Sequence, residues 1–295
     1  MSAPTSRPGG GISSAWLAAY RPMAAAAAAA VRCSAAWARF RGDRAAEEAA
    51  AQRLAEPGAL ERLPRGAVWL HAASVGEAGL LPPLLAALRG AGWNGPFLIT
   101  TQTLTGRDRA ASTGVPAVLA PLDAPGPLGR FIETLRPALH VIVETEIWPL
   151  RLLALERAGV PCALVSARLS ARRFPRYRRL GGLMRTALRR LALISPASEE
   201  DRARLLALGA PVHRMAATGN LKWDAAAQPV PAAEAARLAR ELDLASGRRW
   251  IVLGSVHPGE AGPLARAVLG GPAGDSVGFL VAPRHPERFA AVARE

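Results

Sequence analysis

Two glutamates, Glu144 and Glu146, follow a run of β-branched residues in the segment VIVETEIWP (141–149). The alternation of side chains along a strand predicts that both carboxylates face the same way. Two anions at the end of a buried strand are costly unless they hydrogen-bond a polyol, bind a cation or include a general base. We therefore expect both glutamates to be catalytic, with an internally satisfied structural pair as the alternative.

A second polar cluster follows the apolar run in AVWLHAASVGEAG (67–79). This pattern predicts a buried strand, a tight turn and a helix, which is the opening unit of an α/β domain. Ligands of such domains bind at the carboxyl ends of strands, near helix N-termini. His71, Ser74 and Glu77 are expected to bind substrate there. Ser74 and Glu77 also fit the S-x-x-E capping box, and both interpretations can hold.

Threonines mark the end of a third apolar run, in ITTQTLTGRDRA (99–110). Hydroxyls and free backbone N–H groups at a strand end and helix start suit a carboxylate or a phosphate. Threonine also favours strands and helix caps, which is the structural alternative. The candidate binding residues in this segment are Thr100, Thr101, Thr103, Thr105 and Gly106.

Two segments near the end of the chain, GSVHPGE (254–260) and PRHPER (283–288), suit the phosphate of a nucleotide. The candidate residues are Ser255, His257, Arg284 as the bidentate donor, and His285. The chain has no P-loop motif. Its G-x-G-x-x-G match, GAGWNG (90–95), and its G-x-S-x-G match, GDSVG (274–278), each precede an apolar run instead of linking a strand to a helix, so dinucleotide reduction and P-loop chemistry are not supported. No third acid or histidine completes a metal-ligand spacing, and neither a metal nor another cofactor is expected.

The chain has 37 basic and 23 acidic residues, a net charge of +14, and Lys222 is its only lysine. Nine arginines and no acid lie between Arg168 and Arg190. Such a run suits an anionic membrane surface, a phosphorylated lipid or a nucleic acid, unless it is a solvated helical face. No nucleic-acid reader motif accompanies it, so no nucleic-acid partner is expected. Cys33 and Cys162 have no metal spacing and indicate a reducing compartment.

Apolar runs alternate with helical patterns along the chain, which predicts a parallel sheet with crossover helices. The expected strands are 67–73, 97–102, 115–120, 139–145, 161–166 and 191–197. After a proline- and alanine-rich stretch the rhythm restarts in 248–255 and 278–289. The predicted fold class is α/β, with two Rossmann-like domains facing a cleft. The second domain is expected to be incomplete, because about 50 residues cannot cover both faces of a sheet.

Eight motifs occur in an order that resembles one known family. They are HAASVGE, TTQTLTG, ETEIWP, SARLSARR, SEEDRARLLALGA, TGNLKWD, GSVHPGE and APRHPERF. In these motifs, from about residue 53 to 295, the chain is similar to the 3-deoxy-D-manno-octulosonic acid (Kdo) transferases of lipopolysaccharide assembly. The resemblance implies a metal-independent, inverting glycosyltransferase of the GT-B type. Such an enzyme moves Kdo from CMP-Kdo to the lipid A precursor lipid IVA at the cytoplasmic face of the bacterial inner membrane.

The patterns and the resemblance together divide the chain into four regions. Residues 1–42 are expected to be a disordered start (1–10) and a membrane-associating helix with its positive end cytoplasmic, although packing of that helix on the domain is the alternative. Residues 43–224 are expected to form the Rossmann-like acceptor-binding domain, and 225–247 a linker and helix. Residues 248–295 are expected to start a truncated nucleotide-sugar-binding domain.

The resemblance also implies roles for particular residues. The basic and apolar rim of the N-terminal domain would hold the acceptor lipid, and Glu144 and Glu146 would line the cleft near the sugar. The shared motifs add three expected substrate-binding residues, namely Trp148, Arg168 and Lys222.

The resemblance assigns CMP-Kdo to Ser255, His257 and Arg284. The family's general base lies in a G-E-R-x-G-like segment ahead of the first strand. Its nearest match here is Glu56 in RLAEPG, which is one residue short and has proline in place of the arginine.

Two departures from the family pattern stand out. Ser166 occupies a position where the family usually has asparagine. The sequence also ends soon after APRHPERF, whereas the family continues through glycine-rich and acidic donor-binding motifs, so a chain of this length alone is expected to be inactive. The alternatives are a two-domain glycosyltransferase that uses another nucleotide sugar, and a non-catalytic basic module that binds anionic membranes or nucleic acid.

Overall fold

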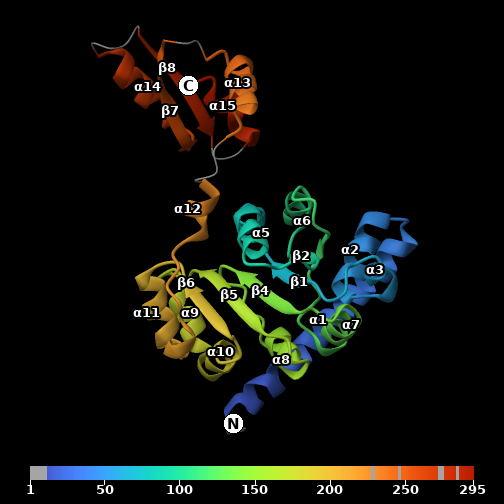
Figure 1. Cartoon of the computed structure of the whole chain (residues 1–295). Coiled ribbons are helices and arrows are strands. Elements are labelled where there is room, and N and C mark those ends of the chain that lie inside the picture. Colours follow the sequence, from blue (N-terminus) through green and yellow to red (C-terminus); the bar gives the residue numbers. More distant parts are fainter. Residues whose placement is uncertain (1–11, 227–229, 245–246, 272–275, 284–285) are drawn as a thin grey trace. The chain divides into compact units, whose positions relative to one another are not determined.

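The chain forms two compact units, Met1–Gln228 and Pro229–Glu295, and Figure 1 shows both. The computed structural model describes residues 12–226, 230–244, 247–271, 276–283 and 286–295. The predicted disordered start lies outside the described residues.

A parallel sheet forms the centre of the larger unit. Its strands are β1 (Val68–His71), β2 (Phe97–Thr101), β3 (Ala117–Leu119), β4 (Leu139–Val143), β5 (Cys162–Ala167) and β6 (Leu193–Pro196). They are arranged in the order β3-β2-β1-β4-β5-β6, and every neighbouring pair is parallel. All six expected apolar runs are strands of this sheet, so the predicted parallel α/β architecture is confirmed.

Helices surround this sheet. In the larger unit they are α1 (Ile12–Phe40), α2 (Arg44–Leu54), α3 (Pro57–Leu60), α4 (Val75–Ala78), α5 (Leu81–Gly90), α6 (Leu104–Ala111), α7 (Pro125–Leu135), α8 (Pro149–Arg157), α9 (Phe174–Arg179), α10 (Gly181–Leu188), α11 (Glu199–Ala207), the 3-10 turn η1 (Val212–Arg214) and α12 (Leu221–Ala226). Trp69 and Ile142 belong to one apolar core, which includes residues of α1, α7, α8 and α10. Leu70, Ile99 and Val141 belong to another core, with residues of α4, α5, α6 and α12. Strand neighbours thus alternate between two cores, as expected for a sheet covered on both faces.

Strand β4 ends earlier than the sequence predicted. Its last residue is Val143, and Glu144 takes a left-handed backbone conformation with φ of 61°. Ser166, near the end of the neighbouring strand β5, also has a positive φ, of 50°. The prediction that strand alternation turns Glu144 and Glu146 the same way is therefore wrong in its reasoning, because neither residue belongs to the strand.

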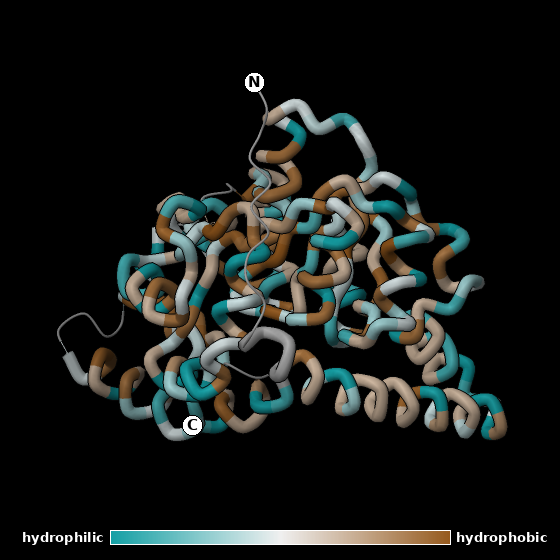
Figure 2. Tube along the Cα trace, turned by 90° about the horizontal axis from the view of Figure 1, so that it is seen from below, coloured by the Kyte–Doolittle hydropathy of each residue, from teal (hydrophilic) through white to brown (hydrophobic). Residues whose placement is uncertain are grey.

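Helix α1 packs along the larger unit. Leu17 and Ala24 are buried in the first core, and α2 and α10 are its main neighbours. Met23, Trp37 and Phe40 are exposed. Figure 2 shows weakly hydrophobic residues along much of this helix, interrupted by hydrophilic ones. No described helix combines the length and apolar character needed to cross a membrane. The packing alternative is observed, and membrane association of α1 stays a prediction.

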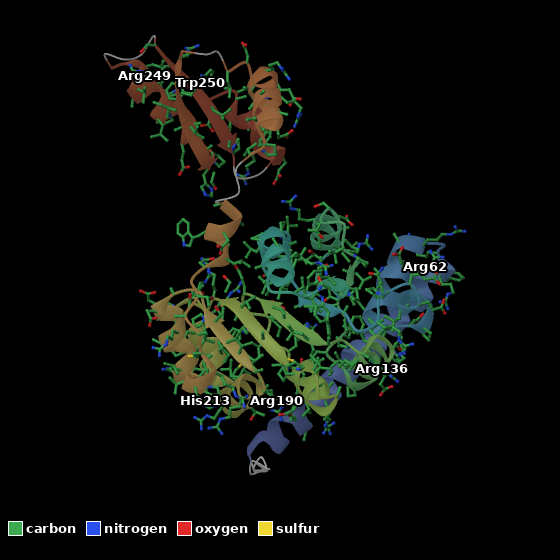
Figure 3. The ribbon with its side chains drawn as sticks, viewed as in Figure 1. Arg62, Arg136, Arg190, His213, Arg249 and Trp250 are labelled. Atoms are coloured by element: carbon green, nitrogen blue, oxygen red, sulfur yellow. The ribbon has the colours of Figure 1, made fainter. Side chains whose placement is uncertain are left out.

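The smaller unit contains two parallel strands, β7 (Arg249–Val256) and β8 (Val277–Pro283). Its helices are α13 (Ala232–Glu241), α14 (Ala261–Leu269), the 3-10 turn η3 (Pro286–Arg288) and α15 (Phe289–Val292). Figure 3 labels Arg249 and Trp250 at the start of β7. The restart of the strand rhythm is confirmed, whereas the role of this unit in donor binding stays a prediction.

Gly106 allows α6 to lie close to the turn that follows β1. A Cβ at this position would lie 2.8 Å from Thr103 Oγ1 and 3.4 Å from the carbonyl carbon of Ser74. The Gly106 N–H donates to the Thr103 hydroxyl at 3.0 Å, and Thr103 is the N-cap of α6. Both residues therefore have a local structural role, which is the cap and the close approach of two segments.

We predict that Gly106→Ala destabilises the chain by about 1–3 kcal/mol, because the new methyl group must displace the cap or the backbone of the turn. Urea unfolding followed by circular dichroism measures the change. Gly129→Ala in α7 is the matched control, because its Cβ would meet no atom closer than 3.8 Å. That control is expected to be neutral or stabilising, and equal stabilities of the two variants would contradict the packing argument.

Candidate active site

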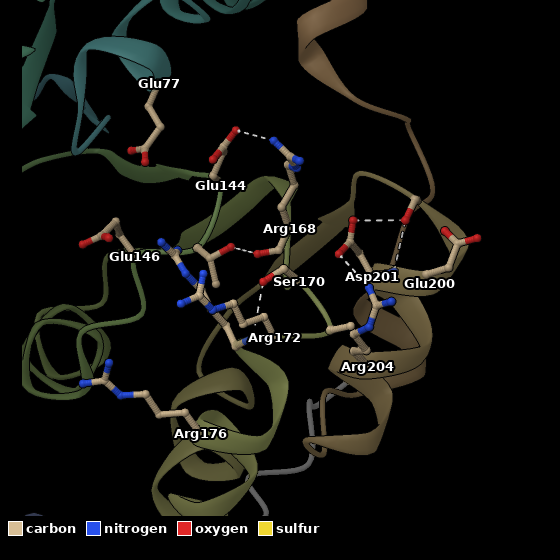
Figure 4. A pocket seen from close by; sticks show the side chains of 14 residues that line it. Glu77, Glu144, Glu146, Arg168, Ser170, Arg172, Arg176, Glu200, Asp201 and Arg204 are labelled. Atoms are coloured by element: carbon tan, nitrogen blue, oxygen red, sulfur yellow. Dashed lines mark hydrogen bonds and ion pairs between the residues drawn. The ribbon is translucent and has the colours of Figure 1, made fainter. Parts of the chain in front are cut away.

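The site lies where the strand order reverses, between β1 and β4. In doubly wound folds ligands bind at this point, beyond the carboxyl ends of the strands. Here the turn after β1 leads to Glu77, and the segment after β4, Glu144–Trp148, forms what we call the site loop. A cavity of about 1010 Å³ opens beside them (Figure 4). It is lined by Glu77, Glu144, Thr145, Glu146, Arg168, Ser170, Ala171, Arg172, Arg173, Arg176, Ser198, Glu200, Asp201 and Arg204.

Glu144 is held by two cations that the sequence also singled out. Its Oε1 lies 3.1 Å from Lys222 Nζ and 3.5 Å from Arg168 Nη1. Lys222 is on α12, and Arg168 follows β5, so segments distant in the sequence compensate this charge. Glu144 forms ion pairs, as the structural alternative expects. It also lines the cavity, as the catalytic alternative expects.

Glu146 accepts a hydrogen bond from its neighbour in the site loop. Trp148 Nε1 donates to Glu146 Oε2 at 2.9 Å. Burial raises the pKa of Glu146, while the Trp148 hydrogen bond and the charges of Arg151 and Arg173 oppose that rise. The predicted neighbours Glu146 and Trp148 are thus brought together, and the indole fixes the direction of the carboxylate.

Among the carboxylates that line the cavity, Glu77 is the one whose pKa is shifted most. Ser74 is the N-cap of α4, as the capping-box interpretation predicted, and Glu77 accepts a hydrogen bond from the backbone N–H of Ala73. Burial raises the pKa of Glu77 to about 7, and the negative charges of Glu144 and Glu146 add to the rise against the Ala73 hydrogen bond. Glu77 can therefore exchange a proton near neutral pH.

The opposite wall of the cavity is basic. Arg172, Arg173 and Arg176 are exposed, and none of their side chains forms an ion pair with a described residue. Arg204 lies 3.5 Å from Asp201. Motif analysis did not single out these wall residues individually, although the basic run between 168 and 190 indicated such a surface.

Only the first part of that basic run contributes to the cavity. Arg190, which Figure 3 labels, follows α10 at the end of the run. It pairs with Glu156 at 2.8 Å. Arg190 precedes β6, whereas the cavity lies at the carboxyl ends of the strands. The arginines near residues 172–176 are therefore the ones available to an anion in this site.

An apolar groove of about 650 Å³ adjoins the cavity. Its walls come from α1, the site loop with Pro149, and α9 and α10. It is lined by Ala19, Tyr20, Met23, Thr145, Glu146, Ile147, Trp148, Pro149, Arg173, Arg176, Tyr177, Leu180, Leu183 and Met184. The groove and the cavity share Thr145, Glu146, Arg173 and Arg176, so one molecule can contact both.

The structure places several predicted ligands away from the cavity. His71 is fully buried, and its Nδ1 lies 2.9 Å from Thr100 Oγ1, to which Trp69 Nε1 also donates at 2.7 Å. Burial keeps the pKa of His71 well below its usual range. Thr101 is also buried, and it donates to the backbone carbonyl of Thr103. These side chains support the strand ends instead of contacting the opening.

Thr105 and Glu56 do not line the cavity either. The Thr105 hydroxyl donates to Thr103 Oγ1 at 3.4 Å, and Glu56 is the N-cap of α3. Ser255 and His257 are exposed in the smaller unit, where Ser255 has a φ of 61° and the His257 N–H donates to Glu260 at 2.7 Å.

The last two predicted donor residues, Arg284 and His285, lie outside the described residues. Within the described part of the chain no cluster of His, Cys, Asp and Glu could hold a metal ion.

Comparison with known proteins identifies the family. A family model described as 3-deoxy-D-manno-octulosonic-acid transferase (kdotransferase) matches residues 43–225. A 3-deoxy-D-manno-octulosonic acid transferase from Bordetella pertussis is 36% identical over 250 residues, which cover 80% of this chain and 56% of that protein. Its namesake from Haemophilus influenzae is 33% identical over 257 residues, which cover 82% of this chain and 58% of that protein. The chain thus spans somewhat more than half the length of these relatives.

Solved structures with low sequence identity share the fold. UDP-GlcNAc 2-epimerase from Neisseria meningitidis, bound to UDP-GlcNAc, matches with a TM-score of 0.58 and 14% identity, over 77% of this chain and 68% of that one. The epimerase from Methanocaldococcus jannaschii matches with a TM-score of 0.52 and 15% identity, with the same coverage. These matches confirm a parallel-sheet α/β fold that resembles GT-B glycosyltransferases. By the family match and the identities of its relatives, the chain belongs to the 3-deoxy-D-manno-octulosonic acid transferase family of glycosyltransferases.

Proposed function

We propose that this chain carries the acceptor site of an inverting glycosyltransferase that moves Kdo from CMP-Kdo to lipid IVA. One observation supports the proposal most, namely that the charged cavity and the apolar groove meet at shared residues. A bis-phosphorylated, acylated disaccharide needs that combination. Its phosphates suit arginines, its acyl chains suit apolar side chains, and its attacking hydroxyl needs a proton acceptor.

Three exposed arginines of the cavity wall are the proposed phosphate ligands. Arg172, Arg173 and Arg176 are exposed, and guanidinium groups bind phosphate oxygens bidentately. Tyr177 and Met184 in the adjoining groove offer apolar contact for an acyl chain. The protein would therefore take its acceptor from the cytoplasmic face of an anionic inner membrane, where the arginines also favour binding.

Glu77 is the proposed proton acceptor for the attacking primary hydroxyl. Its pKa of about 7 suits a general base near neutral pH. Glu144 is bound by Lys222 and Arg168, so it is suited to orient the sugar hydroxyls by accepting hydrogen bonds. Glu146 would do the same from the groove side. Glu56 stays a predicted base that the geometry of the cavity does not support.

The proposed reaction forms one bond and breaks one. The acceptor oxygen attacks the anomeric carbon of Kdo, the bond from that carbon to the CMP phosphate oxygen breaks, and the hydroxyl proton passes to Glu77. Ser255, His257, Arg284 and His285 are the proposed partners of CMP-Kdo. Positive charge and free N–H groups around a leaving phosphate would stabilise the charge that develops on it.

We predict that Arg173→Gln combined with Arg176→Gln weakens binding to lipid IVA about tenfold, because two charge-assisted contacts to phosphate are lost. Binding is measured by sedimentation with phosphatidylcholine vesicles that contain lipid IVA. Vesicles of equal surface charge made with phosphatidylglycerol measure generic attraction. Raising the salt concentration is expected to weaken binding to the phosphatidylglycerol vesicles before it weakens binding to the lipid IVA vesicles.

The matched control is Arg178→Gln combined with Arg179→Gln, which removes the same charge from α9 outside the cavity and the groove. It is expected to change binding to the two kinds of vesicle equally. If the wild-type chain binds both vesicles alike, and both double variants weaken that binding alike, the chain is a generic anionic-membrane module and the acceptor proposal fails.

We predict that Glu77→Gln stabilises the chain at pH 8 but not at pH 4. An unfolded glutamate ionises near its ordinary pKa of 4.5 and the folded one at about 7, so ionisation between these values opposes folding. Glutamine removes this effect and keeps an acceptor for the Ala73 N–H. Melting temperatures at both pH values measure it, with the exposed Glu133→Gln as the control. A pH-independent difference would show that Glu77 has no raised pKa.

A further inference from the structure

Helix α8 begins directly after the site loop, and a distant carboxylate caps it. Trp148 occupies its N-cap without a capping side-chain bond, and Pro149 has no N–H. The next two N–H groups, of Leu150 and Arg151, donate to the two carboxylate oxygens of Asp123 at 3.1 and 2.6 Å. Asp123 is 9% exposed. It therefore satisfies two free helix donors and places a negative charge at the positive end of the helix.

Hydrogen bonds connect this cap to the site. The Leu152 N–H donates to the Trp148 carbonyl at 3.1 Å, which ties Trp148 to the first turn of α8. The Trp148 indole in turn donates to Glu146 at 2.9 Å. The position of the Glu146 carboxylate thus depends on where α8 begins, and Asp123 holds that point.

A buried cation adds an electrostatic link between the same groups. The Arg151 side chain is 1% exposed, and its guanidinium hydrogen-bonds none of the described residues. Its Cζ lies 5.4 Å from the centroid of the Trp69 ring. Burial lowers the pKa of Arg151 to about 10, and the negative charges of Asp123 and Glu146 oppose that change. A buried charge without hydrogen bonds depends on such counter-charges.

Helix α1 reaches the same carboxylate. Tyr20, on α1, lies beside Asp123, and burial together with that anion raises the pKa of Tyr20 far above its ordinary value. Tyr20 also lines the apolar groove. Asp123 therefore contacts both a wall of the groove and the helix that positions the site loop.

We propose that Asp123 is a positioning residue: by capping α8 it fixes Trp148 and so holds Glu146 in the cavity, and through Tyr20 it couples Glu146 to the groove. The inference deepens the proposed function and rests on it for the role of Glu146. The positioning itself concerns only the structure of the site, so a measurement on Glu146 tests it separately.

The test is an NMR titration of Glu146 in the full chain with 13C-labelled glutamate, using Glu146→Gln to assign its signal. In Asp123→Asn one acceptor oxygen remains, but an NH₂ group faces the other backbone donor and the charge is gone. We expect the pKa of Glu146 to fall by about half a unit or more, because solvent exposure of the carboxylate and removal of the nearby Asp123 charge outweigh the loss of the Trp148 hydrogen bond, which alone would raise it. Without the cap the site loop can expose the Glu146 carboxylate to solvent. Arg151 loses the charge of Asp123, so Glu146 becomes its remaining counter-charge. Arg173, Tyr177 and Glu77, the other charged or titratable neighbours of Glu146, are unchanged in this variant.

The matched control is Asp43→Ala, which removes a carboxylate cap bound to the Ala46 N–H at 3.0 Å in α2. It is expected to lower the melting temperature without moving the Glu146 titration. An unchanged titration in Asp123→Asn, with a loss of stability like that of Asp43→Ala, would overturn the proposal.

Tyr20→Phe keeps the proposal testable if Asp123→Asn does not fold. It is expected to shift Glu146 in the same direction by a smaller amount, and no shift would overturn the coupling to the groove. If the titration shifts as expected while the wild-type chain shows no preference for lipid IVA, the proposed function fails and the positioning role stands.

Discussion

Three carboxylates gathered at one edge of a parallel sheet set the constraint on which this site depends. Like charges in a partly buried place oppose folding unless each receives a cation or a donor. Glu144 receives Lys222 and Arg168, and Glu146 receives the Trp148 indole. Glu77 receives one backbone N–H and keeps a pKa near 7. The three carboxylates are therefore compensated unequally. Glu77 has no cationic partner among those described above, and it is suited to exchange a proton near neutral pH.

The compensating groups come from distant parts of the chain, so the site is a product of the whole larger unit. Lys222 reaches Glu144 from α12, and Arg168 reaches it from the end of β5. Glu144, directly after β4, and Ser166, near the end of β5, both have left-handed backbone. For a residue other than glycine this conformation costs on the order of 1–2 kcal/mol, and asparagine tolerates it better than serine. Ser166 thus has a backbone conformation that asparagine, the residue the family resemblance leads us to expect there, would adopt at a lower cost.

The sequence predicted the sheet because apolar runs and helical patterns alternate, and such a pattern has few solutions other than parallel strands with crossover helices. It also predicted most of the carboxylates of the cavity, since polar residues directly after buried strands must meet at one edge. It could not predict the left-handed turn at Glu144, which ended the strand and changed the direction of the side chain. Nor could it distinguish His71 and Thr101, which are buried, from Glu77, which lines the opening. Asp123 was not predicted, because its role depends on a contact with Arg151 that no local pattern indicates.

The central claim is that an anionic acceptor binds where the cavity and the groove meet. Chemical-shift mapping with a water-soluble bis-phosphorylated glucosamine disaccharide carrying short acyl chains tests it most directly. The account predicts that the largest changes fall on the side chains of Arg173 and Arg176, on the Trp148 indole and on Glu146. Changes confined to other surfaces, such as the exposed side of α7 or the smaller unit, would contradict it.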